Sequence, residues 1–238
     1  MHHVVLEQWS RGASAMHRRD PRAKCAALLV FLVVLATAHR EVLAVGAALL
    51  ALLVGALLAA RVPLSGALAR AATVLPFTLL FGAVCWLAGD VERGLAVVLK
   101  SYLSAIAVVT LVSTTPLPLL LRGLEMAGVP RFLLMVAQFL SRYLFVISEE
   151  AQHMRAAAAA RGSDRHPLRF HAAAGRLAVL FARSYERAEG IHHAMLARGF
   201  AGRFHTLALP RFAAADAAFL ACAALAPVLL RAAVERFV

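Results

Sequence analysis

The residues of this chain best suited to specific binding chemistry are two arginines in a repeated tripeptide, Ala-Arg-Gly. It occupies Ala160, Arg161 and Gly162, and again Ala197, Arg198 and Gly199. Each copy ends a polar helical pattern, and glycine at that position is a common helix stop. A guanidinium can hold a carboxylate through two parallel hydrogen bonds. We therefore expect two helix tips that each present one arginine.

Two interpretations of these tips remain open from the residues alone. Arginine near a helix C-terminus complements the helix dipole, and glycine is the commonest cap, so ordinary capping explains one occurrence well. Two such tips in one polar region favour docking to acidic partners. Loss of one member of such a buried pair commonly costs about 2–5 kcal/mol.

Catalytic and metal-binding chemistries find little support in the residue pattern. The only lysines, Lys24 and Lys100, do not follow glycine, so a phosphate-binding GxxxxGK[ST] loop is absent. Neither HExxH nor GxSxG occurs, and the adjacent His192 and His193 would diverge on a helix. We therefore predict no catalytic residue, no bound metal and no cofactor. A membrane-embedded metal-dependent enzyme that uses the histidines is the less favoured alternative.

The apolar runs also lack ligands for a transported cation. They contain no aspartate or glutamate, and Asp216 lies only at the edge of the last run. Cys25, Cys85 and Cys222 form no CxxC pair, so neither a disulfide framework nor a zinc site is indicated. The chain is not expected to hold a substrate ion itself.

The composition indicates a membrane protein. Of the 238 residues, 62% are hydrophobic, against about 45–50% in soluble domains. Each apolar run approaches the ~17–25 residues that a helix needs to cross a bilayer. We predict an all-α membrane protein with about five transmembrane helices and a cytoplasmic coupling domain of long amphipathic helices. The predicted spans are 23–38, 43–59, 71–88, 95–112 and 213–230.

The net charge of +12 is explained by topology rather than by nucleic-acid binding. Arginines crowd the N-terminal leader and the segment 122–211, and positive segments stay on the cytoplasmic side. The protein is thus expected in the cell (inner) membrane, with the loops 39–42 and 89–94 facing outward. The fifth span would leave the C-terminus outside, although Arg231 and Arg236 argue against that.

These patterns divide the chain into four segments. They are a cytoplasmic leader (1–22), a four-span transmembrane block (23–115), a cytoplasmic coupling domain with two long helices (116–210), and a final transmembrane helix with the C-terminus (211–238). Asp20 is the expected N-cap of the first span, and Pro21 its first residue. The segment 122–131 reads as a polar hinge, and 163–170 as a turn.

The two long helices of the coupling domain are predicted at about 132–161 and 172–198. In the first, Gln138, Arg142 and Glu149 form one polar stripe, so we expect it to lie along the membrane face or to enter the membrane only shallowly. In the second, an apolar stripe recurs at three- and four-residue steps. Its members are Leu177, Phe181, Ser184, Ala188, Ile191 and Met195, with Arg183, Glu186, Arg187 and Glu189 mostly outside it.

The segments RYLFVISEEAQHMRAAAAARG (142–162) and RSYERAEGIHHAMLARGFAGRF (183–204) resemble the two coupling segments of a known family. This is the transmembrane T component of energy-coupling factor transporters. The amino-acid sequence around the two motifs is most similar to the cobalt-type branch of that family, CbiQ. The pattern HRRDPRAK (17–24) resembles the start of the first span in that family. The resemblance covers nearly the whole chain.

The resemblance implies a non-catalytic subunit with several partners. Two cytoplasmic ABC-type ATPase subunits would each receive one coupling helix, held by Arg161 or Arg198. A separate substrate-binding membrane subunit, the S subunit, would hold the metal ion. The implied cargo is cobalt, with nickel or a vitamin as the alternative.

Overall fold

The computed structural model describes residues 9–10, 12, 14–38, 42–126, 128–162, 169–202 and 212–237. Within these residues the chain is helical and contains no β-strand, which confirms the predicted all-α fold. The chain forms two compact units. The first comprises residues 1–128 and 210–238, and the second comprises 129–209.

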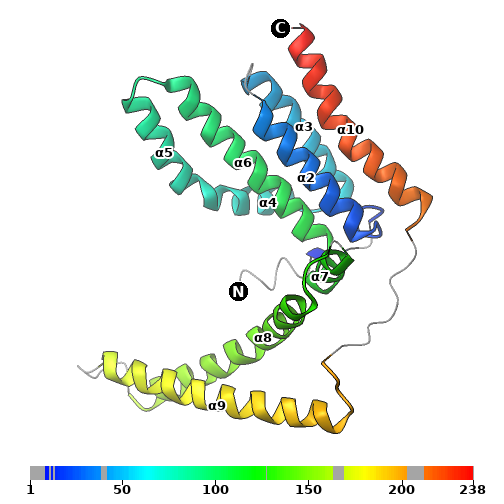
Figure 1. Cartoon of the computed structure of the whole chain (residues 1–238). Helices are drawn as coiled ribbons and strands as arrows, with labels where there is room; N and C mark the ends of the chain where they lie inside the picture. Colours follow the sequence, from blue (N-terminus) through cyan, green and yellow to red (C-terminus); the bar gives the residue numbers. More distant parts are fainter. Residues whose placement is uncertain are drawn as a thin grey trace. The chain divides into compact units, whose positions relative to one another are not determined.

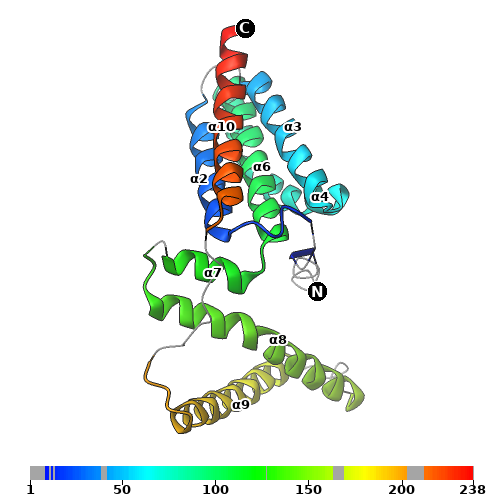
Figure 2. The same ribbon diagram turned by 90° about the vertical axis from the view of Figure 1, so that its right-hand side faces the viewer.

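The first unit is a bundle in which α2, α3, α6 and α10 pack side by side (Figures 1 and 2). Its core is apolar, and Leu49, Leu57 and Leu103 are completely buried. The chain turns between α4 and α5 through a short 3₁₀ helix, η1 (Ala72–Val74). The α-helices are α2 (Pro21–Thr37), α3 (Val42–Ala60), α4 (Leu64–Ala71), α5 (Leu75–Leu87), α6 (Val91–Thr114), α7 (Leu117–Met126) and α10 (Ala214–Phe237).

The start of α2 follows the predicted capping chemistry. The backbone N–H of Arg22 donates a hydrogen bond of 2.8 Å to Oδ1 of Asp20, and Pro21 is the first helical residue. Aspartate satisfies an N–H group that has no partner within the helix, and proline loses nothing there because its missing N–H would be unpaired anyway. The predicted N-cap is confirmed.

Five of the described helical segments are long and apolar enough to cross a membrane. This number agrees with the prediction of about five transmembrane helices. Three of them match predicted spans closely. The predicted 71–88 span begins earlier, at Leu64, because α4, η1 and α5 follow one another without a break. The five segments are Leu43–Ala60, Leu64–Leu87, Val91–Thr114, Arg131–Ala160 and Ala214–Val234.

These five candidate membrane segments differ from the five predicted spans in two places, at α2 and at residues 131–160. The predicted 23–38 span corresponds to α2, whose 17 residues reach about 26 Å, slightly less than the ~30 Å hydrocarbon core. The segment Arg131–Ala160 has the required length and composition instead. Those two properties do not test its predicted position along the membrane face, which rests on its charged stripe and stays a prediction.

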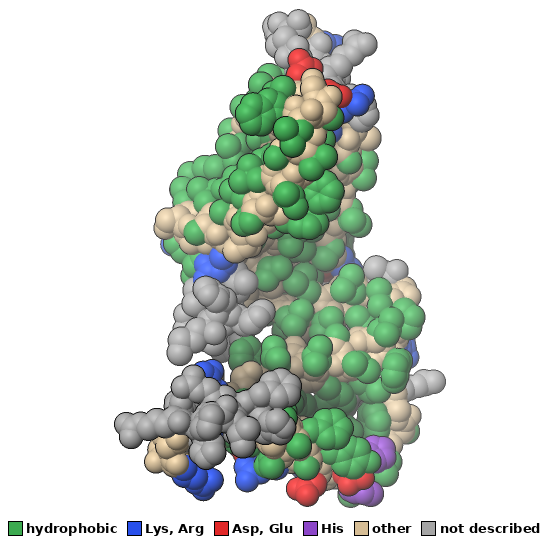
Figure 3. All heavy atoms as spheres, turned by 90° about the vertical axis from the view of Figure 1, so that its left-hand side faces the viewer, with side chains coloured by type: hydrophobic (Ala, Val, Ile, Leu, Met, Phe, Trp, Pro, Cys, Tyr) green, Lys and Arg blue, Asp and Glu red, His purple; other side chains and the backbone are tan. Residues whose placement is uncertain are grey.

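One outer face of the first unit is largely apolar. Figure 3 shows hydrophobic side chains covering this face, with charged side chains gathered toward its ends. Phe77, Phe81 and Trp86 of α5 are each more than half exposed, at 66%, 51% and 68%. Soluble proteins rarely expose such continuous apolar surface, so this face is suited to lipid or to another membrane subunit.

Helices α5 and α6 pack closely where Gly82 faces Gly94. A Cβ atom added at Gly94 would lie 2.9 Å from the carbonyl oxygen of Gly82, a backbone atom that cannot swing away. We expect Gly94→Ala to destabilise the protein by about 1–3 kcal/mol through overpacking. Gly55→Ala on α3 is the matched control, because an added Cβ there meets nothing within 4 Å. Thermal unfolding of both variants in detergent checks this, and equal melting temperatures would contradict it.

The second unit consists of α8 (Arg131–Ala160) and α9 (Arg169–Ala197), which confirms the two predicted long helices. The predicted hinge at 122–131 is partly wrong, because residues 122–126 belong to α7. That helix packs in the first unit, where a Cβ at Gly123 would lie 3.3 Å from Cβ of Pro21. Of the predicted turn at 163–170, residues 163–168 lie outside the described residues, and 169–170 already belong to α9.

Candidate functional site: two arginine-bearing helix tips

Both Ala-Arg-Gly copies end a long helix, as predicted. Helix α8 ends at Ala160 and α9 ends at Ala197. The glycines that follow have positive φ angles, 79° at Gly162 and 77° at Gly199. Glycine adopts this left-handed conformation without the steric cost that a Cβ atom brings. We call residues 160–162 the first tip and residues 197–199 the second tip.

Backbone hydrogen bonds hold the second tip in a Schellman cap. The N–H of Gly199 donates to the carbonyl of Leu196 at 2.9 Å, and the N–H of Phe200 donates to the carbonyl of Met195 at 3.0 Å. This pair of bonds satisfies carbonyls that would otherwise lack partners at the helix end. At the first tip, the N–H of Gly162 donates to the carbonyl of Ala159 at 2.9 Å. Both arginines therefore sit on backbone whose course is set by the cap.

The side chains of the tips face outward. Ala160, Arg161 and Gly162 are exposed, and so are Ala197, Arg198 and Gly199. Within the described part of the chain, neither guanidinium has an ion pair or a side-chain hydrogen bond. A guanidinium in this setting is accessible to a carboxylate of another molecule, while its charge also complements the helix dipole.

The two tips lie at opposite ends of the α8–α9 pair (Figures 1 and 2). The chain reverses direction after the first tip, and α9 then carries it away for 29 residues, about 43 Å. The tips therefore do not form one joint site. Each is placed to contact a separate partner surface.

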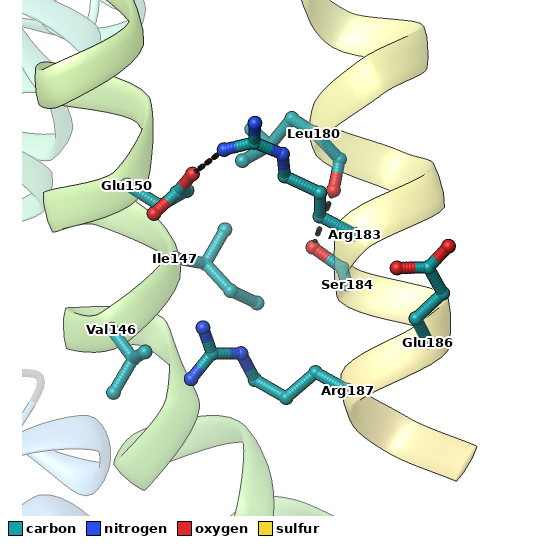
Figure 4. A pocket seen from close by; sticks show the side chains of 8 residues that line it. All are labelled: Val146, Ile147, Glu150, Leu180, Arg183, Ser184, Glu186 and Arg187. Carbon is teal, nitrogen blue, oxygen red and sulfur yellow. Dashed lines mark hydrogen bonds and ion pairs between the residues drawn. The ribbon is translucent and has the colours of Figure 1, made fainter. Parts of the chain in front are cut away.

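The two helices contact each other through a charged pair. Arg183 of α9 donates to Oε1 of Glu150 of α8, and Figure 4 shows the two side chains pointing toward one another. The arginine side chain is 60% exposed, and such exposed pairs contribute only about 0.2–1 kcal/mol. Beside this pair lies a cavity of about 470 Å³. It is lined by Val146, Ile147, Glu150, Leu180, Arg183, Ser184, Glu186 and Arg187.

The predicted apolar stripe of α9 is only partly the face turned toward α8. Ser184 lines the cavity, but Leu177 and Phe181 are 66% and 73% exposed. Leu180, which was outside the predicted stripe, lines the cavity together with Arg183. The helix is rotated toward its charged side, which leaves apolar side chains uncovered within the second unit.

The histidines do not gather into a site within the described residues. The rings of His192 and His193 have centroids 6.0 Å apart and are tilted by 53°. Among the described residues, no group of three or more His, Cys, Asp or Glu side chains could hold a metal ion. His166 lies outside the described residues.

Comparison with known proteins relates this chain to transport proteins. Residues 12–206 match the family model CbiQ, described as a cobalt transport protein. The chain is also 29% identical over 228 residues to the energy-coupling factor transporter transmembrane protein EcfT of Bacillus selenitireducens. That alignment covers 84% of each chain and therefore extends beyond the two tips to most of the membrane helices.

Proposed function

Because the chain belongs to the CbiQ family of cobalt transport proteins, we propose that it is the coupling subunit of an energy-coupling factor transporter for cobalt. In this role it transmits conformational changes from two cytoplasmic ATPase subunits to a separate substrate-binding membrane subunit. The subunit itself is not a catalyst. The observation that best supports this proposal is the pair of exposed arginine tips. Each tip lies at the C-terminal end of its own helix, and the two tips lie at opposite ends of the α8–α9 pair.

The tip geometry supports one ATPase subunit for each helix. Each tip presents one guanidinium on a capped helix end, which suits bidentate binding of an acidic side chain in a groove. Two tips separated by roughly the length of α9 fit two copies of a partner better than one. When the copies approach or separate, the crossing angle of α8 and α9 would change with them.

The proposed topology places the N-terminus and the second unit in the cytoplasm and the bundle in the inner membrane. Helices α2 and α10 run in the same direction, because their first residues are linked by Asp216 and their last turns by Arg231. Arg231 donates to the carbonyl and hydroxyl oxygens of Thr37 at the end of α2. This local role accounts for an arginine near the outer end of α10, so it does not oppose an external C-terminus.

Reconstitution tests the proposal. The chain is co-expressed with candidate ATPase and substrate-binding subunits from the same genome, and the purified assembly is placed in liposomes. We expect ATP-dependent accumulation of radiolabelled cobalt. Preferential accumulation of nickel would reassign the cargo. Absence of both co-purification and ATP-dependent uptake would overturn the proposed function.

A further inference from the structure

A buried polar cluster joins three helix ends in the first unit. Lys24, in the first turn of α2, is only 4% exposed. Its ammonium group donates to the carbonyl oxygen of Thr114 at 2.9 Å and to the hydroxyl of Thr115 at 3.0 Å. It also donates to the carbonyl oxygen of His17, before α2, at 3.4 Å. A buried cation is costly unless its donors are satisfied, and here two of the three acceptors come from the end of α6. We call Asp20, Lys24, Thr114, Thr115 and Asp216 the hub.

The carboxylate of Asp216 connects the third helix to the hub. Its Oδ1 accepts a hydrogen bond of 3.2 Å from the N–H of Asp20, at the start of α2. Its Oδ2 accepts one of 3.1 Å from the N–H of Ala213, which precedes α10. The side chain thus caps α10 and fixes the beginning of that helix to the beginning of α2. Asp20 and Asp216 are each 9% exposed.

The hub contains the end of α6 and the start of α10, which precede and follow α7 and the second unit in the sequence. Thr115 lies two residues before α7, after which the chain enters the second unit at residue 129, and Asp216 follows shortly after that unit ends at residue 209. Helix α7 itself packs on Pro21, next to Asp20, through Gly123. Both connections to the coupling helices are therefore anchored to the first turn of α2.

We propose that Lys24 and Asp216 are positioning residues that pass the motion of the coupling helices to the membrane bundle. This inference rests on the proposed function, because it assumes that force enters through the second unit. Hydrogen bonds to a buried charge are directional, so they hold the helix ends in a defined geometry. Apolar contacts are less directional and would define that geometry less strictly. Without these hydrogen bonds, the connecting segments could move while the bundle stays in place.

The chain contains its own control for this idea. Lys100 of α6 also donates to backbone carbonyls of α2, those of Ala36 at 3.2 Å and Ala38 at 2.5 Å. Both lysines therefore join α6 to α2 through the same chemistry. Lys100 does so at the opposite end of α2, away from the connections to the second unit. Comparing the replacement of Lys24 with the replacement of Lys100 shows whether an effect depends on where the lysine lies or only on the hydrogen bonds that it makes.

The test compares Lys24→Met, Lys24→Arg and Lys100→Met in the complete transporter in liposomes. Cobalt uptake and ATP hydrolysis are measured on the same preparations and divided by the amount of assembled complex. We expect Lys24→Met to transport at least about tenfold less cobalt for each ATP hydrolysed. Lys24→Arg restores part of the ratio because it keeps the charge and the donors. Lys100→Met stays within about twofold of the unmodified chain.

An unchanged ratio of uptake to hydrolysis in Lys24→Met overturns the inference, and so does an equal fall in Lys100→Met. If Lys24→Met does not assemble, Thr115→Val and Asp216→Asn are compared with Lys100→Met instead. We expect the same fall in cobalt uptake for each ATP hydrolysed. The unmodified transporter separates the two proposals. If it shows no ATP-dependent uptake, the proposed function fails and the hub fails with it. If it transports and Lys24→Met transports as efficiently, only the hub fails.

Discussion

Replacement of both Arg161 and Arg198 by alanine is expected to abolish co-purification of the chain with the proposed ATPase subunits. Both guanidiniums are exposed at capped helix ends, so their removal should leave the fold of the chain intact. Loss of one member of a buried charged pair at an interface commonly costs about 2–5 kcal/mol. Even 2 kcal/mol at each tip would weaken binding roughly a thousandfold. Affinity capture from detergent-solubilised membranes, quantified for each subunit, measures the effect.

The matched control is Arg155→Ala combined with Arg187→Ala. These arginines lie on the same two helices, are exposed, and remove the same amount of charge, but they do not stand at the tips. The amount of ATPase subunit captured with the control variant should stay within about threefold of that captured with the unmodified chain. General electrostatic attraction between exposed charges contributes little to binding. Retention of the ATPase subunits by the tip variant, or equal loss in both variants, would show that the tips are not the docking elements.

The local features of the two tips could be predicted from sequence because capping depends on neighbouring residues. Glycine after Arg161 and after Arg198 predicted where α8 and α9 end, and the positive φ angles at Gly162 and Gly199 confirm it. The Asp20–Pro21 start of α2 belongs to the same class of local chemistry. Only a few consecutive residues decide such features.

The packing of α9 could not be predicted in the same way. The predicted apolar stripe contains Leu177 and Phe181, and both residues are exposed in the second unit. The face toward α8 is decided partly by Glu150 and Arg183, which lie 33 residues apart and whose pairing no periodic pattern reveals. A helix with apolar residues on more than one side has several ways to pack, and only the tertiary structure selects among them.

The hub was also invisible to pattern analysis, although the sequence carried a signal for it. The sequence pattern places Lys24 at the start of the first predicted span and Asp216 at the edge of the last one, without a partner for either. Their contacts join positions 90 and 196 residues apart. The signal was that the first turn of an apolar helix carries one of only two lysines in the chain. A charge in such a place needs partners from other helices.

Replacement of both Gly162 and Gly199 by valine is expected to weaken ATPase binding while leaving both arginines in the chain. Each glycine has a φ angle near 80°, where a residue with a Cβ atom pays about 1–2 kcal/mol. Relief of that strain turns the arginine that follows the last helical residue, so that its guanidinium points in another direction. We expect binding weaker by roughly 30-fold to 1,000-fold, measured by titration of detergent-solubilised chain with the ATPase subunits.

The control for this variant is Gly175→Val combined with Gly190→Val, inside α9. A Cβ atom meets nothing within 4 Å at either position, and neither residue has a positive φ angle. Valine is a better helix former than glycine, so these changes should leave binding unchanged. Equal weakening by both pairs would mean that bulk on the helices, rather than the direction of the arginines, disturbs the interface. Weakening confined to the caps would show that docking depends on where the glycine places the guanidinium as well as on its charge.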